Sequence, residues 1–544
     1  MRRPLIIAAL LALSPMPALA DDLPQTSADA IRGHVTFLAD DLLEGRGTAS
    51  RGYQIAAHYV ATQLAALGLQ PAGVDGSWLQ PIELLESTRV VPAARASIER
   101  DGQRIELEPA VDFLPGNSYF GTAAEVTAPL VFVGFGITAP ELDHDDFGTI
   151  DVRGKVAVVL SGAPAQFPNN QRAHHSRNKT PGLVARGAVG IVYVDTPESE
   201  RRSPWQKSVL SAWVPSMRLI DGDGQLVDAY PEIKASLSLN IASASKLFDG
   251  GPKTLEEIWA DATAGKPQAF DLPATISISL RSALSNASCA NVVGLLPGAD
   301  PELANEYVVF TAHLDHIGKG AAVNGDTIYN GALDNASGIA TMLETARLLA
   351  TAPERPKRSI LFVAVTAEER GLLGSRHFGR NPTVPKEAIV ANVNTDMPVL
   401  LYPAAGLTPF GAEHSTLGAV AQRVIEAEGL TVVPDPSPEE VRFVRSDQYS
   451  FVREGIPAIH IKDGQLSSDP DVDAAAVFKQ FMQRDYHMPS DQVDLPIHWP
   501  SFARLARVNA RIGLAIANDP VRPSWLPGDF FGETFGGQRT ATDE

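Results

Sequence analysis

Hydrophobic residues recur at helical spacing in four stretches of the chain. Side chains three or four residues apart lie on one face of a helix, so this spacing predicts amphipathic helices. The first two helices flank Leu-Glu-Gly-Arg at 43–46, and the last one closes the periodic part of the sequence. The apolar stripes are Ile31–Leu42, Ala56–Leu67, Ile339–Leu349 and Phe502–Ile512.

Between about 290 and 518, continuous apolar runs alternate with the predicted helices. The runs are Tyr307–Ala312, Ile360–Val365, Ala388–Val393 and Ile456–Ile461. A strand that is apolar on both sides is typical of a parallel sheet covered on both faces. We therefore predict an α/β fold, with a mixed, mainly parallel sheet flanked by helices.

The sequence pattern differs between about 128 and 265. Short β-rich runs at Leu130–Phe135, Lys155–Leu160 and Ile191–Val194 are separated by turns and by a small-residue helix at Pro181–Gly187. This pattern predicts a separate β-rich module. His174 and His175 lie in it without a nearby carboxylate in the sequence, and a solvent loop is the expectation for them.

Composition and charge narrow the functional classes. The 544 residues are 44% hydrophobic and 20% charged, as in a globular protein. The formal net charge of −19 argues against general nucleic-acid binding. The single cysteine, Cys289, excludes an intrachain disulfide, and its uncharged sequence neighbourhood favours a buried role over a catalytic one.

The first twenty residues have the pattern of a secretory signal peptide. Arg2 and Arg3 precede the apolar run Leu5–Leu13, and a small-residue cleavage site ends at Ala20. We therefore expect an exported protein, periplasmic or secreted. No later stretch reaches the length of a membrane span.

Chemically active side chains stand at the ends of the predicted strands. His313 ends the first run, Glu368 and Glu369 follow the second, and Asp396 follows the third. Asp334 lies in the loop that leads into the helix at 339–349. Ligands bind beyond the carboxyl ends of parallel strands, so these residues are expected to converge.

Carboxylates gathered at one buried edge would repel one another unless cations neutralise them. Imidazole and carboxylate ligands suit zinc, and two metals can share a bridging carboxylate. One further imidazole is needed, and His487 in Tyr-His-Met-Pro-Ser-Asp is the best candidate.

Five motifs in this order resemble peptidase family M28, the exported di-zinc aminopeptidases. They are His-x-Asp at 313–315, Asp-Asn-Ala-Ser-Gly at 334–338, Glu-Glu at 368–369, Asn-x-Asp at 394–396 and Tyr-His at 486–487. The resemblance covers 285–518 well and the opening helices moderately. Residues 128–265 resemble the protease-associated (PA) domain often inserted in this family.

The resemblance implies a role for each residue. Asp334 would bridge two Zn²⁺ ions, with His313 and Asp396 on one metal and Glu369 and His487 on the other. Glu368 would be the general base for a metal-bridged hydroxide. Asp315 would orient His313. The implied fold is of the zinc-exopeptidase (phosphorylase/hydrolase) type.

This interpretation divides the chain into five parts. They are a signal peptide (1–20), an N-terminal part of the peptidase domain (21–125), an inserted PA domain (126–265), a zinc peptidase catalytic domain (266–520) and a C-terminal extension (521–544). The expected substrates are peptides with a free N-terminus; the oligomeric state stays open.

Other functions remain open at this point. A related zinc carboxypeptidase, a glutaminyl cyclase or a non-catalytic receptor could use the same scaffold. Four further residues are expected to play lesser roles. His316 would at most contact a metal ligand without binding the metal, and Ser337 would cap a helix. Asp447 would shape the pocket or serve structure alone, and Tyr449 would approach the oxyanion of the reaction.

Overall fold

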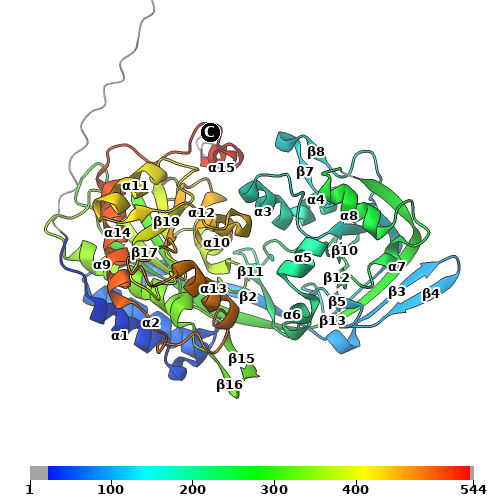
Figure 1. The fold of residues 1–544 in the computed structure, drawn as a ribbon, viewed down its shortest axis with the longest axis horizontal. Coiled ribbons are helices and arrows are strands. Elements are labelled where there is room, and N and C mark those ends of the chain that lie inside the picture. The colour runs from blue at the N-terminus through cyan, green and yellow to red at the C-terminus, as the bar shows by residue number, and fades with distance from the viewer. Residues whose placement is uncertain (1–22, 267, 540–544) are drawn as a thin grey trace, which may run out of the picture.

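The computed structural model describes residues 23–266 and 268–539. The predicted signal peptide, 1–20, lies outside the described residues. The chain forms two units side by side, each built around its own sheet (Figure 1). Within the described part, no helix has the length and apolar character needed to cross a membrane.

The first unit contains the mixed sheet that the sequence predicts. Its centre is four parallel strands in the order β17, β14, β18, β21, and antiparallel strands complete both sides. The strands are β1 Gln70–Pro71, β2 Leu79–Arg89, β11 Ser216–Ile220, β13 Ala269–Leu296, β14 Tyr307–His313, β17 Ser359–Val365, β18 Ile389–Asn394, β19 Gly406–Phe410, β20 Thr431–Val432 and β21 Ala458–Asp463.

The central strands are buried on both faces, which explains their unbroken apolar sequence. In β14, Val308 and Phe310 belong to one hydrophobic cluster, while Val309 between them belongs to another on the opposite face. The alternation follows from the pleat, which turns successive side chains to opposite sides. The predicted fold class is therefore confirmed.

Helices cover both faces of this sheet (Figure 1). On the face of Val308 and Phe310 lie α1 Ala28–Leu38, α2 Arg51–Ala66, α9 Ser337–Ala350, α11 Leu417–Ala427 and α14 Trp499–Asn518. On the other face lie α10 Leu373–Arg380, α12 Gln448–Val452 and α15 Phe530–Phe535. One further helix, α13 Ala474–Arg484, precedes the late Tyr-His motif.

The second unit holds a sheet in the order β4, β3, β13, β6, β9, β10, β12, β5. Its strands besides β13 are β3 Arg95–Arg100, β4 Gln103–Leu107, β5 Phe113–Pro115, β6 Ala123–Val133, β9 Val156–Leu160, β10 Gly190–Val194 and β12 Ala235–Leu239. Its helices are α3 Asn169–Arg177, α4 Lys179–Ala185, α5 Pro197–Arg202, α6 Trp205–Leu210, α7 Ser245–Phe248 and α8 Leu255–Thr263. Two short hairpins, β7 Thr138–Ala139 with β8 His144–Asp145 and β15 Gly318–Val323 with β16 Asp326–Tyr329, complete the strands.

Strand β13 joins the two units. Its residues 269–281 pair with β6 in the second sheet, whereas residues 282–292 pair with β2 and residues 292–296 with β17 in the first. The second sheet also contains β3, β4 and β5, which precede residue 126. The β-rich unit thus extends beyond 126–265 at both ends.

The prediction of a solvent loop at His174 and His175 was wrong. Both lie on α3, and their imidazoles have partners. His174 Nδ1 lies 2.6 Å from the hydroxyl of Tyr449 in the first unit, and His175 Nε2 lies 2.7 Å from Glu141. The partners are distant in sequence, so spacing along the chain could not reveal them.

The segment after Pro520 packs against the first unit through Phe531 and Phe535. Phe531 is fully buried, with ring centroids 5.0 Å from His414 and 5.8 Å from Phe443. Asp529 accepts a hydrogen bond of 2.6 Å from His414 Nδ1. Burial lowers the pKa of His414, but Asp529 and Glu413 raise it to about 9. The imidazole is therefore protonated at neutral pH and forms an ion pair with Asp529.

We predict that Phe531→Ala releases this segment. Removing a buried phenylalanine ring costs about 3–5 kcal/mol, which exceeds what one ion pair can offset. Chymotrypsin should then cleave after Trp525 faster than in the parent protein, as measured by intact mass. Val521→Ala, at a side chain that is 71% exposed, is the control. Equal cleavage rates in the two variants would contradict the anchoring role of Phe531.

Candidate metal centre

Three neighbouring parallel strands bring the predicted residues to one edge of the first sheet. His313 is the last residue of β14, Glu368 and Glu369 follow β17, and Asp396 follows β18. Because β14 lies between β17 and β18, the three carboxyl ends are adjacent. The convergence expected from the strand ends is what the structure shows.

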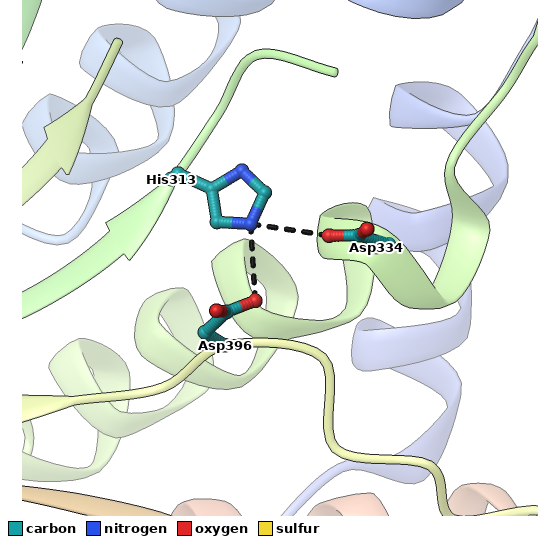
Figure 2. Close-up of side chains that lie close together, drawn as sticks. All are labelled: His313, Asp334 and Asp396. Atoms are coloured by element: carbon teal, nitrogen blue, oxygen red, sulfur yellow. Dashed lines mark hydrogen bonds and ion pairs between the residues drawn. The ribbon is translucent and has the colours of Figure 1, made fainter. Parts of the chain in front are cut away.

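Figure 2 shows the first group of side chains around the ring of His313. His313 Nε2 lies 3.0 Å from Asp396 Oδ1 and 3.2 Å from Asp334 Oδ1. One imidazole nitrogen carries a single hydrogen or a single lone pair, and so cannot fully satisfy two carboxylates. Two carboxylate oxygens and one imidazole nitrogen aimed at the same point are a ligand set for a cation.

The second group lies on the other oxygen of Asp334. His487 Nε2 lies 3.1 Å from Asp334 Oδ2 and 3.3 Å from Glu369 Oε2. Asp334 therefore faces one group with Oδ1 and the other with Oδ2, as a carboxylate shared by two metals would. All five residues named as ligands in the sequence come together here.

His316 comes closer than the sequence suggested. Its Nδ1 lies 2.8 Å from Glu369 Oε1 and 3.9 Å from Asp334 Oδ2. Two triads have ligand atoms within 4.8 Å of one another: His313, Asp334 and Asp396, and His316, Asp334 and Glu369. The expectation that His316 is at best a partner of the ligands stays a prediction, because a hydrogen bond to Glu369 and a place among the ligands both fit this position. Its place directly after His-x-Asp was the only signal for it.

The donor set fits zinc. Each atom is an imidazole nitrogen or a carboxylate oxygen, and these are ligands that zinc takes in catalytic sites. Burial raises the pKa of Asp334, but His313 and His487 lower it well below its ordinary value, so the carboxylate is charged. A charged carboxylate that is 3% exposed needs cations beside it.

Glu368 differs electrostatically from Glu369. Burial first, and then the negative charges of Glu369 and Asp396, raise the pKa of Glu368 well above its ordinary value, although His313 opposes this. His487 and His316 instead lower the pKa of Glu369, against the effect of burial. Two adjacent carboxyl groups with pKa values displaced in opposite directions suit an acid–base group next to a ligand.

Asp315 supports both sides of the centre. Its backbone oxygen, not its carboxylate, lies 3.0 Å from His313 Nδ1, a partner that a metal-bound imidazole commonly needs. Its carboxylate instead accepts hydrogen bonds from the backbone N–H of Glu368 at 3.1 Å and from Thr48 at 2.8 Å. Asp315 thus holds the backbone of Glu368 as well as the ring of His313.

The loop that carries Asp334 is held by two residues that the sequence analysis missed. Asp491 accepts the backbone N–H groups of Leu333 at 2.9 Å and of Asp334 at 3.0 Å. Arg46, fully buried, donates to the carbonyl oxygens of Asn330 and Gly331. Arg46 belongs to Leu-Glu-Gly-Arg and Asp491 ends Tyr-His-Met-Pro-Ser-Asp, so membership of these motifs was the available signal.

Three lesser expectations have mixed outcomes. Ser337 does not cap α9: its hydroxyl donates to the carbonyl of Leu333 at 2.9 Å. Asp447 is fully buried near His313, and burial raises its pKa to about 7. Cys289 is partly buried, and burial raises its pKa to about 12, which fits the expectation that it is not a catalytic thiol.

Comparisons with known proteins can now be set beside this geometry. Residues 291–513 match the sequence model of peptidase family M28. The resemblance inferred from the motifs is thereby confirmed for this segment, which contains every candidate ligand.

Curated relatives include three proteins of related description. The probable lipoprotein aminopeptidase LpqL of Mycobacterium tuberculosis is 24% identical over 500 residues, which cover 86% of this chain and 81% of that protein. Aminopeptidase NAALADL1 of Mus musculus is 32% identical over 136 residues, 24% of this chain and 16% of that one. Leupeptin-inactivating enzyme 1 of Streptomyces exfoliatus is 35% identical over 114 residues, 21% of this chain. The last two matches span only 16% and 23% of those relatives' lengths.

Among solved structures, the aminopeptidase from Aneurinibacillus sp. strain AM-1 superposes with a TM-score of 0.52 at 18% sequence identity. The superposition covers 93% of this chain and 97% of the other. At this identity the likeness concerns the fold, which is shared across both units.

We predict that Asp491→Ala weakens metal binding about 10- to 100-fold, because the loop that carries Asp334 loses the two hydrogen bonds that the N–H groups of Leu333 and Asp334 donate to this carboxylate. Competition with a chromogenic chelator measures the zinc affinity. Asp494→Ala, at an exposed carboxylate three residues away, is the matched control. Equal zinc affinity in the two variants would show that Asp491 does not position the ligand loop.

Proposed function

We propose that this protein is a zinc metallopeptidase, specifically an exported di-zinc aminopeptidase that acts on peptides with a free N-terminus. The observation that carries the proposal is the sharing of Asp334 between two ligand groups, with Glu368 beside them on the wall of one cleft. The matched family and the aminopeptidase descriptions of LpqL and NAALADL1 support it. A further relative, 34% identical over 134 residues, is a probable zinc metalloprotease of Pyricularia oryzae, which supports zinc as the metal.

The proposed ligands divide around Asp334. His313 and Asp396 would hold one zinc ion, Glu369 and His487 the other, and Asp334 both. His316 lies within reach of the second group. Bound zinc would lower the pKa of a water molecule and polarise the scissile carbonyl.

Glu368 has the environment of a general base. Burial and the neighbouring carboxylates raise its pKa well above that of a solvated carboxyl group, which makes the carboxylate a stronger base. In the proposed mechanism Glu368 takes a proton from the attacking water and gives it to the leaving amine. Asp315 fixes the backbone of Glu368 and thus the position from which the carboxylate acts.

The remaining assignments rest on the sequence. We propose export through residues 1–20 and a PA-type fold for the β-rich unit, with the catalytic residues all in the first unit. The decisive experiment is a panel of amino-acid amides and their N-blocked equivalents, with and without a chelator. Chelator-sensitive release from the free amides alone would support an aminopeptidase. Hydrolysis of the blocked substrates would contradict it.

We predict that Glu368→Gln lowers kcat by about 100-fold or more, because the amide cannot accept the proton. Zinc content, measured by elemental analysis, should stay unchanged. Glu354→Gln, at an exposed glutamate, controls for loss of a negative charge. A Glu368→Gln protein with normal turnover would refute the assignment of the base.

We also predict that Asp334→Ala loses at least one zinc ion per chain, because each of the two ligand groups then loses the oxygen that Asp334 contributes to it. Inductively coupled plasma mass spectrometry measures the stoichiometry. Asp326→Ala, at an exposed aspartate in the preceding hairpin, should keep the parent zinc content. Unchanged stoichiometry in Asp334→Ala would rule out the bridging role.

A further inference from the structure

A cleft of about 630 Å³ opens beside Glu368 and Glu369. One wall comes from the second unit, with Arg177 at the end of α3 and Asp228 between β11 and β12. The opposite wall comes from α10, α12 and the residues that flank α12. Its volume lies within the range of pockets that hold small ligands.

Five arginines line this cleft, in a chain whose net charge is −19. They come from three separate parts of the fold: α3, α10 and the segment around α12. The residues are Arg177, Arg376, Arg380, Arg445 and Arg453. The protein as a whole is acidic, so its composition does not explain why five guanidinium groups gather in one cleft.

The carboxylates nearby neutralise only part of this charge. Asp228 forms an ion pair with Arg376, and Glu440 lies 3.2 Å from Arg445. Glu454 is engaged by Lys386, outside the cleft, at 2.7 Å. The other two carboxylates of the wall, at 368 and 369, belong to the candidate metal centre.

Three of the five arginines keep their charge available. Among residues 23–266 and 268–539, no carboxylate lies within ion-pair distance of Arg177, Arg380 or Arg453. Arg177 donates one hydrogen bond of 2.6 Å from Nη1 to the carbonyl of Val444, which leaves its Nε and Nη2 as donors for a ligand. Arg453 is only partly exposed, at the end of α12.

The guanidinium groups also repel one another. Burial and then Arg453 lower the pKa of Arg376, and burial and then Arg445 lower the pKa of Arg177. Like charges that are held close destabilise each other unless an anion lies between them. A guanidinium binds a carboxylate through two parallel hydrogen bonds, which makes the peptide carboxylate a suitable anion.

We propose that this cleft binds a carboxylate of the peptide substrate next to the scissile bond. The inference rests on the proposed peptidase function, because the candidate base and the metal ligand at 368–369 form one end of the cleft. Two sources share this chemistry: the side chain of an N-terminal Asp or Glu, and the terminal carboxylate of a dipeptide. Peptides that carry either group are the preferred substrates.

Two kinetic comparisons test the proposal and separate the sources. The first compares kcat/KM for the amides of Glu, Leu and Lys. The second compares Leu-Ala with Leu-Ala amide, which differ only at the terminal carboxylate. One charge-assisted contact corresponds to about tenfold or more in kcat/KM, so the zinc-loaded parent should prefer the acidic member of at least one comparison by that factor.

The Arg453→Gln variant should reduce that preference to about threefold or less, whereas Arg453→Lys, which keeps the charge, should retain part of it. Arg32→Gln, at an exposed arginine of α1 far from the cleft, should behave as the parent. Arg177→Gln is measured beside Arg453→Gln, and zinc content and thermal unfolding identify a variant that fails to fold.

The outcomes distinguish the two proposals. Hydrolysis of Leu amide without preference for an acidic member in either comparison overturns the carboxylate cleft and leaves the peptidase function intact. A preference that survives both Arg453→Gln and Arg177→Gln also overturns it. Failure of the zinc-loaded parent to hydrolyse any of these substrates instead refutes the peptidase function itself.

Discussion

The neutralisation of buried carboxylates at one sheet edge is the constraint on which the rest of the site depends. Asp334, Glu369 and Asp396 are brought together by elements that the hydrophobic core holds in place, although the three carboxylates repel one another. Imidazoles from His313, His487 and His316 provide partial compensation. The proposed pair of cations would supply the remaining positive charge at the two points where the candidate ligand atoms converge.

The residues around the Asp334 loop hold its charged side chain in place. A loop that carries a charged ligand must not relax away from it, and the loop around Asp334 is held through its backbone. Gly331, with φ at +60°, is required because a Cβ there would lie 2.1 Å from the Asp334 carbonyl oxygen and 2.6 Å from the His316 ring. Arg46 and Asp491 complete the restraint from opposite ends of the chain. The N-terminal helices thus belong to the site as much as the strands do.

Much of the first unit could be predicted from sequence because its signals are local. The strands at 307–313 and 359–365 are apolar on both faces, and the residues that follow them are polar, so a short window contains both signals. The long-range contacts carried no such signal. The contact of His174 with Tyr449, the engagement of Glu369 by His316, and the role of Asp491 each depend on residues that only the folded chain brings together. The continuity of β13 was also hidden, because its two halves serve different sheets and have different burial patterns.

That shared strand has a mechanical consequence. A module attached by two flexible linkers can rotate freely, but here a hydrogen-bonded ribbon runs from one sheet into the other. Its pairing changes from β6 to β2 at Arg281–Ser282, where the ribbon passes between the units. Opening or closing the arginine-lined cleft therefore means bending or twisting this ribbon, and its stiffness limits how wide a polypeptide the two walls can admit.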